Sequence, residues 1–185
     1  MLYIKWGRRL MRVDDREFRK VLGHFATGVV VVTASSAEDR AGVTVNSFSS
    51  LSLEPPLVMF SLAQNLRSLA LFQSAERIGI NILTADQRHI SQRFATAGAD
   101  KWVGTPARAG ANGAILIDDA LAHLECELHS VVDGGDHAII ICRVLSFRIN
   151  EGEPLMYFKG GYLNAAGASG TGGAAKNSEH MLRVQ

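Results

Sequence analysis

Short runs of β-branched residues, each bounded by turn-forming residues, limit most strongly the folds that this chain can adopt, because such runs favour strands. The runs GVVVVT at 28–33 and AIIICRV at 138–144 are apolar on both faces, as in buried strands. In the alternating run RIGINIL, three isoleucines share one face, while Gly79, Asn81 and Leu83 share the other. With further strands expected at 42–46, 56–62, 115–118, 120–132 and 155–159, the sequence predicts a mainly β fold, a closed or partly closed β-barrel with short helices.

Three short helices are predicted between these strands. Asp14 and Glu17 have the spacing of a capping box, and an apolar stripe of Phe18, Val21, Leu22 and Phe25 follows. A second capping box, Thr84 and Gln87, precedes a helix that carries Ile90 and Phe94. A third helix is expected from about Asn65, its plausible N-cap, to Ser74.

Length and charge set the broad class of protein. A chain of 185 residues suggests one domain, and a net charge of +1 gives no argument for nucleic acid or an acidic membrane as partner. No apolar run reaches the roughly 20 residues of a membrane helix. Cys126 and Cys142 form no CxxC pair, which fits a reduced, cytoplasmic protein. We expect an N-terminal extension at 1–13, the domain at 14–163 and a disordered, Gly-, Ala- and Ser-rich tail at 164–185.

The stretch 41–63, AGVTVNSFSSLSLEPPLVMFSLA, is the first candidate ligand site. Its first part is rich in small hydroxyl and amide residues, among them Thr44, Asn46, Ser47 and Ser50. The following Pro55-Pro56 step holds Glu54 and Pro55 extended, so hydroxyls and free backbone groups are offered to a ligand. An ordinary Ser-rich loop before a core strand explains this stretch equally well.

Two further features are open to both a functional and a structural interpretation. Free N–H groups at the helix start, with Arg67 and Ser68 beside Asn65, suit a phosphate, although Asn65 could simply cap and Arg67 be solvated. Gly79 and Asn81 on one strand face suggest that something approaches the backbone there, or else that the strand is a solvated edge. The long segment 95–114, which contains Asp100-Lys101-Trp102, is predicted to be a functional or mobile loop.

Histidines provide the remaining candidates. One face of the strand 120–132 carries His123, Glu125, Glu127 and His129. Two histidines and two glutamates could bind a metal, but the favoured interpretation is the solvent face of a half-buried strand. No metal site is therefore predicted. His137 lies where the turn 133–137 meets a buried strand, and from this pattern alone a hydrogen bond to the turn is favoured over a functional role.

Seven segments together carry a family resemblance. They are FRKVLGHFATGVVVVTA (18–34), GVTVNSFSSLSLEPPLVMFSL (42–62), RSLALF (67–72), IGINILTADQ (78–87), GADKW (98–102), GDHAIIICRV (135–144) and LMYFKGGY (155–162). In this order and spacing, the chain resembles the flavin reductase family, the small components of two-component flavin-dependent monooxygenases. The resemblance implies an FMN-binding type of split β-barrel, usually a homodimer with flavin near the dimer interface.

The resemblance also implies roles for individual residues. The segment with Thr44, Val45, Asn46, Ser47 and Ser50 would run along the isoalloxazine ring, largely through its backbone. Ser61, Asn65, Arg67 and Ser68 would lie near the phosphate end, and Asn81, Phe94 and Lys101 would approach the flavin or its phosphate. His137 would stand beside the nicotinamide as the catalytic residue, with Tyr162 closing that pocket. Relatives usually have Asp-Arg-Phe at Asp100-Lys101-Trp102, so the lysine keeps the charge but loses the bidentate fork; Lys159 likewise stands where relatives often carry Arg.

The implied reaction is hydride transfer from NADH or NADPH to FMN or FAD, with reduced flavin diffusing to a separate monooxygenase. Small residues, Ser47 and Gly79, would leave one ring face open, and backbone N–H groups of 44–50 would stabilise charge on the reduced ring. The chain has no Gly-rich dinucleotide fingerprint, so the nicotinamide would stack directly over the flavin. Two alternatives stay open: a tight flavin-binding electron carrier that does not use NAD(P)H, and a related barrel for haem or a pyridoxal-type phosphate, with His24 and His137 as the candidate axial ligands.

Overall fold

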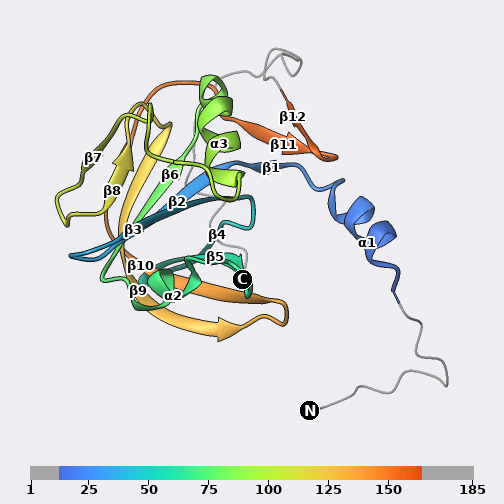
Figure 1. Cartoon of the computed structure of the whole chain (residues 1–185), viewed down its shortest axis with the longest axis horizontal. Coiled ribbons are helices and arrows are strands. Elements are labelled where there is room, and N and C mark those ends of the chain that lie inside the picture. Colours follow the sequence, from blue (N-terminus) through green and yellow to red (C-terminus); the bar gives the residue numbers. More distant parts are fainter. Residues whose placement is uncertain (1–12, 164–185) are drawn as a thin grey trace.

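A seven-stranded antiparallel sheet forms the body of the protein, which a computed structural model describes over residues 13–163 (Figure 1). In sheet order its strands are β3 (Arg40–Val45), β2 (Val30–Ser35), β6 (Arg77–Ile82), β9 (Ala122–Asp133), β10 (His137–Ile149), β5 (Pro56–Ala63) and β4 (Ser49–Leu53). The edge strands β3 and β4 are not hydrogen-bonded to each other, so the curled sheet is a split β-barrel. The predicted fold class is thereby confirmed, and the predicted β2–β3 hairpin is present.

The interior of the barrel is filled by the inward-facing side chains of these strands. Val32, Phe60, Ile80 and Ile140 are fully buried there. The short helix α2 (Leu69–Ser74) adds Phe72, whose ring meets Phe60 edge to face at 6.2 Å. Burying these large apolar side chains provides the main stabilisation of the barrel.

A second core lies outside the barrel, between the sheet and smaller elements. It is built by α3 (Arg88–Ala95), the 3-10 turn η1 (Ala85–Gln87), the hairpin β7 (Ala107–Ala109) and β8 (Ile115–Ile117), and the small sheet of β1 (Thr27–Gly28), β11 (Met156–Phe158) and β12 (Gly161–Leu163). The predicted capping box of Thr84 and Gln87 is present. Ile90 and Phe94 point from α3 into this core, as the helical spacing predicts.

The hairpin β7–β8 confirms the close approach expected at one strand face and corrects the prediction for another, because part of the supposed loop 95–114 folds back onto β6 and β9. A Cβ atom at Gly79 would collide with the carbonyl oxygen of Ile115, so the element that approaches this backbone is β8 of the same chain. The predicted solvent face is wrong for His123 and Glu125, whose side chains are only 1% and 9% exposed, but it holds for His129, which is exposed. Strand periodicity cannot show that another segment covers the polar side.

Two predictions about turns are also wrong. The Pro55-Pro56 step does not hold an open hinge, because Glu54 and Pro55, joined by a cis peptide bond, form the tight turn of the β4–β5 hairpin. Asn65 does not cap α2, since Ser68 occupies the N-cap position and makes no side-chain capping bond. Asn65 therefore has no helix-capping role to compete with a ligand-binding role.

The helix α1 (Asp15–Leu22) begins as predicted, with the Asp14 carboxylate accepting from the Glu17 N–H at 2.9 Å. Its apolar stripe, however, packs on no core of this chain: Phe18, Val21, Leu22 and Phe25 are 50%, 68%, 55% and 77% exposed. The helix stands at one side of the body, beyond β1 (Figure 1). Within residues 13–163, no helix is long and apolar enough to cross a membrane. The predicted extension, apart from Val13, and the predicted tail lie outside the described residues.

Candidate functional site

Two adjoining cavities lie along β3 at the split of the barrel. The first, of about 520 Å³, is lined by the end of β3 and the loop after it, by the end of β5, and by the start of β10 with His137. The second, of about 730 Å³, is lined by the start of β3, by 65–68 and by 97–102. Ala63 and Leu66 line both cavities, so the two form one elongated groove. Such a volume suits a cofactor-sized ligand.

β3 presents a free backbone edge to this groove because it pairs only with β2. Lys101 Nζ donates to the carbonyl oxygen of Gly42 at 3.0 Å, which shows that this carbonyl points away from β2. Backbone groups of an antiparallel strand alternate in direction, so Thr44 directs its N–H and C=O to the same free edge. A planar ligand in the groove can therefore be held by main-chain hydrogen bonds.

Ser47 joins the two sides of the split. Its hydroxyl accepts from the Ser61 N–H at 2.9 Å and lies 3.2 Å from the Ser61 carbonyl oxygen. The hydroxyl therefore occupies the position that a further strand residue would take beside β5. Ser47 shapes the groove but its hydroxyl is already engaged, so a ligand contact from this residue comes from the backbone.

His137 lines the first cavity and lies opposite Ala63 of β5, the residue that borders both cavities. Its Nδ1 lies 2.7 Å from Asp136 Oδ1, and a carboxylate partner requires a donor there, so the neutral ring leaves Nε2 as an acceptor. The hydrogen bond from His137 and, where the ring is protonated, its positive charge lower the pKa of Asp136. The Asp136 carbonyl accepts from the Gln64 N–H at 2.9 Å, which fixes this turn against the end of β5.

The second cavity holds the cationic side chains of the groove. Arg67 and Lys101 supply positive charge there, and Asn65 and Ser68 supply hydrogen-bonding groups. Burial lowers the pKa of Lys101, whose ammonium is also fixed by the Phe94 carbonyl at 2.9 Å. Among the described residues Arg67 has no carboxylate partner within salt-bridge distance. A guanidinium without a carboxylate partner, close to a second cation, favours the binding of a phosphate group.

The structure brings most, but not all, of the predicted site residues into this groove. Thr44, Val45, Asn46, Ser47, Ser61 and His137 line the first cavity, and Asn65, Arg67, Ser68 and Lys101 line the second. Ser50 lines neither, because it lies on the exposed strand β4. The expected contact of Ser50 with the ligand stays a prediction, and neither cavity of the groove supports it.

Asn81 and Phe94 do not face the groove, and both are 0% exposed. The Asn81 amide donates to the Val31 carbonyl at 3.0 Å and accepts from the Ile117 N–H at 2.8 Å, so it attaches β8 to the sheet. The Phe94 ring packs edge to face with Trp102 at 5.2 Å in the outer core. Their predicted ligand contacts are corrected, since tertiary packing inside the chain uses both side chains.

Tyr162 does not close the cavity beside His137. It lines a separate cavity of about 190 Å³, which shares Thr44, Val45 and Asn46 with the first. Its hydroxyl lies 2.8 Å from Ser91 Oγ, and Arg88 stands over its ring at 5.0 Å. Tyr162 therefore supports the ligand-binding segment rather than meeting His137 within one chain.

Sequence patterns missed several apolar or backbone contributors to the groove. Ala63, Leu66 and Ile139 line it, as do Gly42 and Arg40 on β3. No sequence signal marks such residues, because their place depends on the register of β3 and β5 around the split. Trp102 has a distinctive position, with the Arg40 guanidinium 4.6 Å above its ring centroid.

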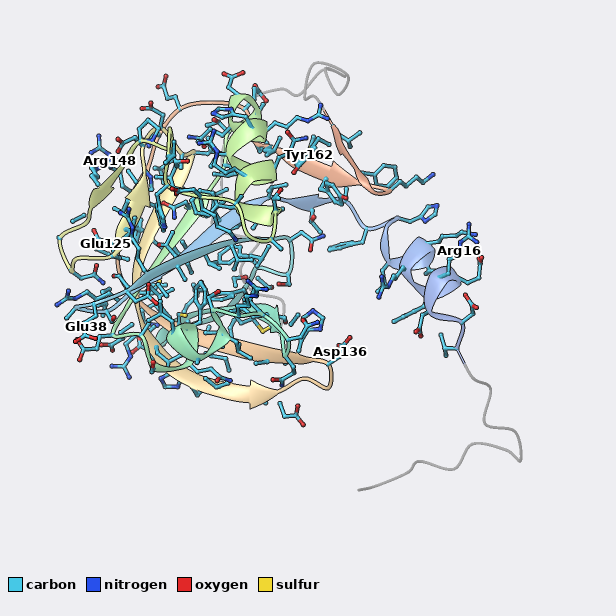
Figure 2. The ribbon with its side chains drawn as sticks, in the orientation of Figure 1. Arg16, Glu38, Glu125, Asp136, Arg148 and Tyr162 are labelled. Carbon is cyan, nitrogen blue, oxygen red and sulfur yellow. The ribbon has the colours of Figure 1, made fainter. Side chains whose placement is uncertain are left out.

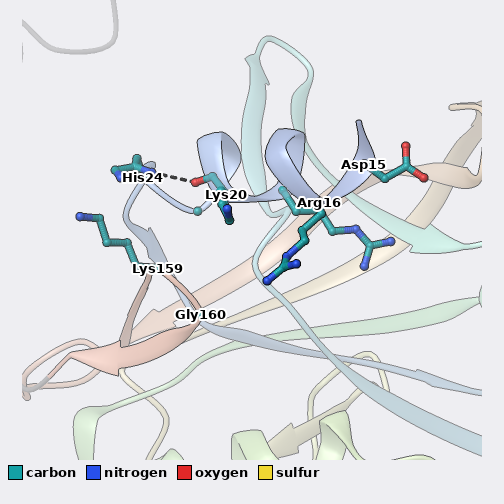
Figure 3. Close-up of a pocket in the computed structure, with 8 residues that line it drawn as sticks. Asp15, Arg16, Lys20, His24, Lys159 and Gly160 are labelled. Atoms are coloured by element: carbon teal, nitrogen blue, oxygen red, sulfur yellow. Dashed lines mark hydrogen bonds between the residues drawn. The ribbon is translucent and has the colours of Figure 1, made fainter. Parts of the chain in front are cut away.

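Other cavities and clusters do not belong to this site. A cavity under α1 is lined by Arg16, Lys20 and His24 together with Lys159 (Figure 3). His24 Nδ1 lies 2.7 Å from the Lys20 carbonyl oxygen, and His24 shares no described cavity with His137, which disfavours the haem alternative. Titratable side chains are spread widely over the molecule (Figure 2), and residues 13–163 contain no group of three His, Cys, Asp or Glu placed to hold a metal.

A split barrel with a cationic groove at its split defines the class of protein: a small-ligand-binding barrel whose ligand has an anionic end. Residues 22–166 match the family described as "Flavin reductase like domain", and the chain belongs to this family. The family resemblance of the sequence is thereby confirmed.

Named relatives agree with this assignment. The chain is 39% identical over 170 residues to a probable flavin reductase from Rhizobium meliloti, covering 91% of this chain and 55% of that protein, so it spans about half of that relative's length. It is 36% identical to the reductase subunit of a flavin-dependent monooxygenase from Mycobacterium tuberculosis, covering 82% of each. A Streptomyces globisporus NADH:FAD oxidoreductase solved with NAD and FAD fragments superposes with a TM-score of 0.77 at 33% identity, covering 81% of this chain and 92% of that one.

Proposed function

We propose that the protein is an NAD(P)H:flavin oxidoreductase, which transfers a hydride from NADH or NADPH to FMN or FAD. The observation that carries the proposal is the groove along the free edge of β3, with His137 in its first cavity and cations in its second. Bound flavin supplies the hydride acceptor, which no side chain of the protein could supply. Family membership and the three named relatives support the same reaction.

Each residue of the groove has a role that depends on the part of the ligand it faces. Thr44 offers backbone groups to the edge of the ring, and Leu66 and Ile139 keep water from its surroundings. Arg67 and Lys101 hold the phosphate, and Ser68 adds a hydroxyl. His137 Nε2 accepts a hydrogen bond from the nicotinamide carboxamide and so orients the donor for transfer. Gly79 has no part in this arrangement because β8 covers it.

The reduced flavin is released to a separate flavin-dependent monooxygenase. The support is the relative from Mycobacterium tuberculosis, which is named as the reductase subunit of such an enzyme. A reduced compartment, the cytoplasm, suits the two free thiols of Cys126 and Cys142, which are buried in the barrel. Burial raises the pKa of Cys126 to about 12, so its thiol is unreactive at neutral pH.

The functional unit is a homodimer in this proposal. An isolated helix of eight residues is only marginally stable, yet α1 buries none of its residues in its own chain. Its exposed Phe18, Val21 and Leu22, with Phe25 just after the helix, form an apolar stripe that a second surface could cover. β10 likewise exposes Phe147 and Ile149, at 73% and 76%. A second copy of the chain that covers these apolar groups would place α1 against a partner.

The decisive experiment follows oxidation of NADH and NADPH by the purified apoprotein, with and without added FMN or FAD. Oxidation that rises and saturates with free flavin supports the reductase. A protein that retains flavin through desalting but oxidises neither nucleotide is an electron carrier instead. Loss of both flavin binding and nucleotide oxidation overturns the proposal.

A further inference from the structure

The groove continues beyond the residues assigned to the flavin phosphate. The second cavity, about 730 Å³, is larger than the first, although a single phosphate needs far less room. Its far wall is made by Arg40 and Trp102, while Arg67 and Lys101 lie in the same cavity. The size and the chemistry of this end both point to a ligand group that extends past the phosphate.

Trp102 is held in a fixed orientation. Its ring meets the Phe94 ring edge to face, with centroids 5.2 Å apart and an interplanar angle of 87°. Its backbone N–H donates to Asp100 Oδ1 at 3.2 Å. Because Phe94 is fully buried in the outer core, Trp102 is a rigid platform at the rim of the cavity.

Arg40 covers this platform. Its Cζ lies 4.6 Å from the Trp102 ring centroid, within the range of a cation–π contact. Arg40 makes no salt bridge with any described carboxylate. A stacked guanidinium keeps a second flat face and unpaired N–H groups at its rim. These two features match a purine base and a phosphate, respectively.

We propose that the Arg40–Trp102 wall is the subsite for the adenosine monophosphate part of FAD, so that the protein prefers FAD to FMN. The adenine stacks on the outer face of the Arg40 guanidinium, which Trp102 supports from below. The rim of the guanidinium, with Lys101 and Arg67, faces the pyrophosphate. This inference rests on the proposed function, because it takes the flavin phosphate to lie beside residues 65–68.

NADH and NADPH also contain an adenosine diphosphate group, so the test must distinguish FAD from the pyridine nucleotide as the ligand of this subsite. Dissociation constants for FAD, FMN and ADP are measured by titration of the apoprotein of wild type, Arg40→Met and Arg40→Lys. Arg40→Met keeps an unbranched aliphatic side chain but removes the positive charge and the planar guanidinium group. Arg40→Lys keeps the positive charge but also lacks the planar group. Arg148→Met, an exposed arginine on β10 remote from the groove, is the matched control (Figure 2).

We expect wild type to bind FAD about tenfold more tightly than FMN, a difference of about 1.4 kcal/mol. Arg40→Met should remove most of this ratio, Arg40→Lys should restore it only in part, and Arg148→Met should leave it unchanged. ADP should compete with FAD and with FMN in wild type, because its outer phosphate occupies the position of the flavin phosphate, and Arg40→Met should weaken ADP as it weakens FAD. The Michaelis constant for NADH should move less than the dissociation constant for FAD.

Three results overturn the inference while the reductase function stands. The first is equal affinity of wild type for FMN and FAD. The second is an equal loss of affinity for both flavins in Arg40→Met. The third is that Arg40→Met raises only the Michaelis constant for the pyridine nucleotide. The last would assign the wall to the pyridine nucleotide. Absence of binding for both flavins in wild type would instead remove the proposed function itself, together with this subsite.

Discussion

The Ser47 hydroxyl bonds the backbone of Ser61 at both its N–H, 2.9 Å away, and its carbonyl oxygen, 3.2 Å away. β4 ends its pairing with β5 at Met59, so the outward backbone groups of Ser61 have no strand partner. One side chain thus replaces a missing strand and connects the loop after β3 to β5. The width of the split, and therefore of the groove, depends on this contact.

Ser47→Ala should lower the free energy of unfolding by about 1 to 2 kcal/mol, because two partly buried backbone groups lose their partner. It should also weaken flavin binding, since the loop that lines the groove is released from β5. Urea denaturation and a flavin titration measure the two effects. Ser49→Ala is the matched control, since the Ser49 hydroxyl contacts only the neighbouring Ser50 carbonyl. Equal effects of both substitutions would contradict the bridging role.

A substitution at Asn81 should lower the stability of the protein without changing its affinity for flavin. Asn81→Leu keeps the branched shape of the side chain but leaves the Ile117 N–H unpaired in a buried site. The free energy of unfolding should fall by roughly 1 to 3 kcal/mol. The flavin dissociation constant of the folded protein should stay within about twofold, a change below roughly 0.4 kcal/mol. Asn65→Leu should show the reverse, and a large loss of affinity in folded Asn81→Leu would return Asn81 to the ligand site.

Lys101 can be tested with a ligand that lacks the phosphate. Lys101→Gln should weaken FMN about tenfold but riboflavin much less, because the ammonium faces the phosphate end. Burial lowers the pKa of Lys101 below its ordinary 10.5, so the charge is lost as pH rises through the lowered value. The preference for FMN over riboflavin should therefore decline at alkaline pH below 10.5. Lys101→Arg, which stays charged, should abolish that decline. An equal loss of FMN and riboflavin in Lys101→Gln would contradict the phosphate contact.

The same shift has a consequence for stability. A lysine whose pKa is lowered in the folded state costs stability while it is protonated, and this cost disappears as pH rises through the lowered pKa. Lys101→Met, which is never charged, should therefore show a smaller gain in stability on going to alkaline pH than wild type shows.

The architecture followed from local patterns because strand periodicity and capping boxes are set by neighbouring residues. Glu17 and Thr84 were placed correctly for that reason. Asn81 and Phe94 were misplaced, since the pattern of their own strand or helix cannot show which distant segment covers it. The hairpin β7–β8 covers the face of Asn81, and Trp102 covers Phe94. Most of the groove was found through family resemblance, whereas Arg40, far from the other cations in sequence, was not.

His137 is expected to act on the nucleotide rather than on the flavin. His137→Ala should lower kcat/KM for NADH at least tenfold, about 1.4 kcal/mol of transition-state stabilisation, while the flavin dissociation constant changes less. Steady-state kinetics with varied nucleotide measure this effect. Values of both turnover and the nucleotide KM within about twofold of wild type would remove the assigned role.

Asp136 reports on the same pair through its titration. The His137 hydrogen bond lowers the pKa of the carboxylate, so its stabilising effect is present above the unfolded value of about 3.9 and is lost as pH falls through the lower folded value. In His137→Ala the Asp136 pKa should return toward about 3.9, which a carbon-detected NMR titration can follow. An unchanged pKa would mean that the pair is not formed in solution.

The apolar stripe of α1 predicts the assembly state. Phe18→Gln with Leu22→Gln keeps helix propensity but removes two apolar side chains that are half exposed in the single chain. If a second copy covers this stripe, light scattering should show a shift from dimer to monomer in the micromolar range, with the barrel still folded by circular dichroism. Arg19→Gln, on the face that lines the cavity under α1, is the control and should remain dimeric. A dimer of undiminished stability in the double variant would show that α1 lies outside the interface, and a monomeric wild type would exclude the dimer itself.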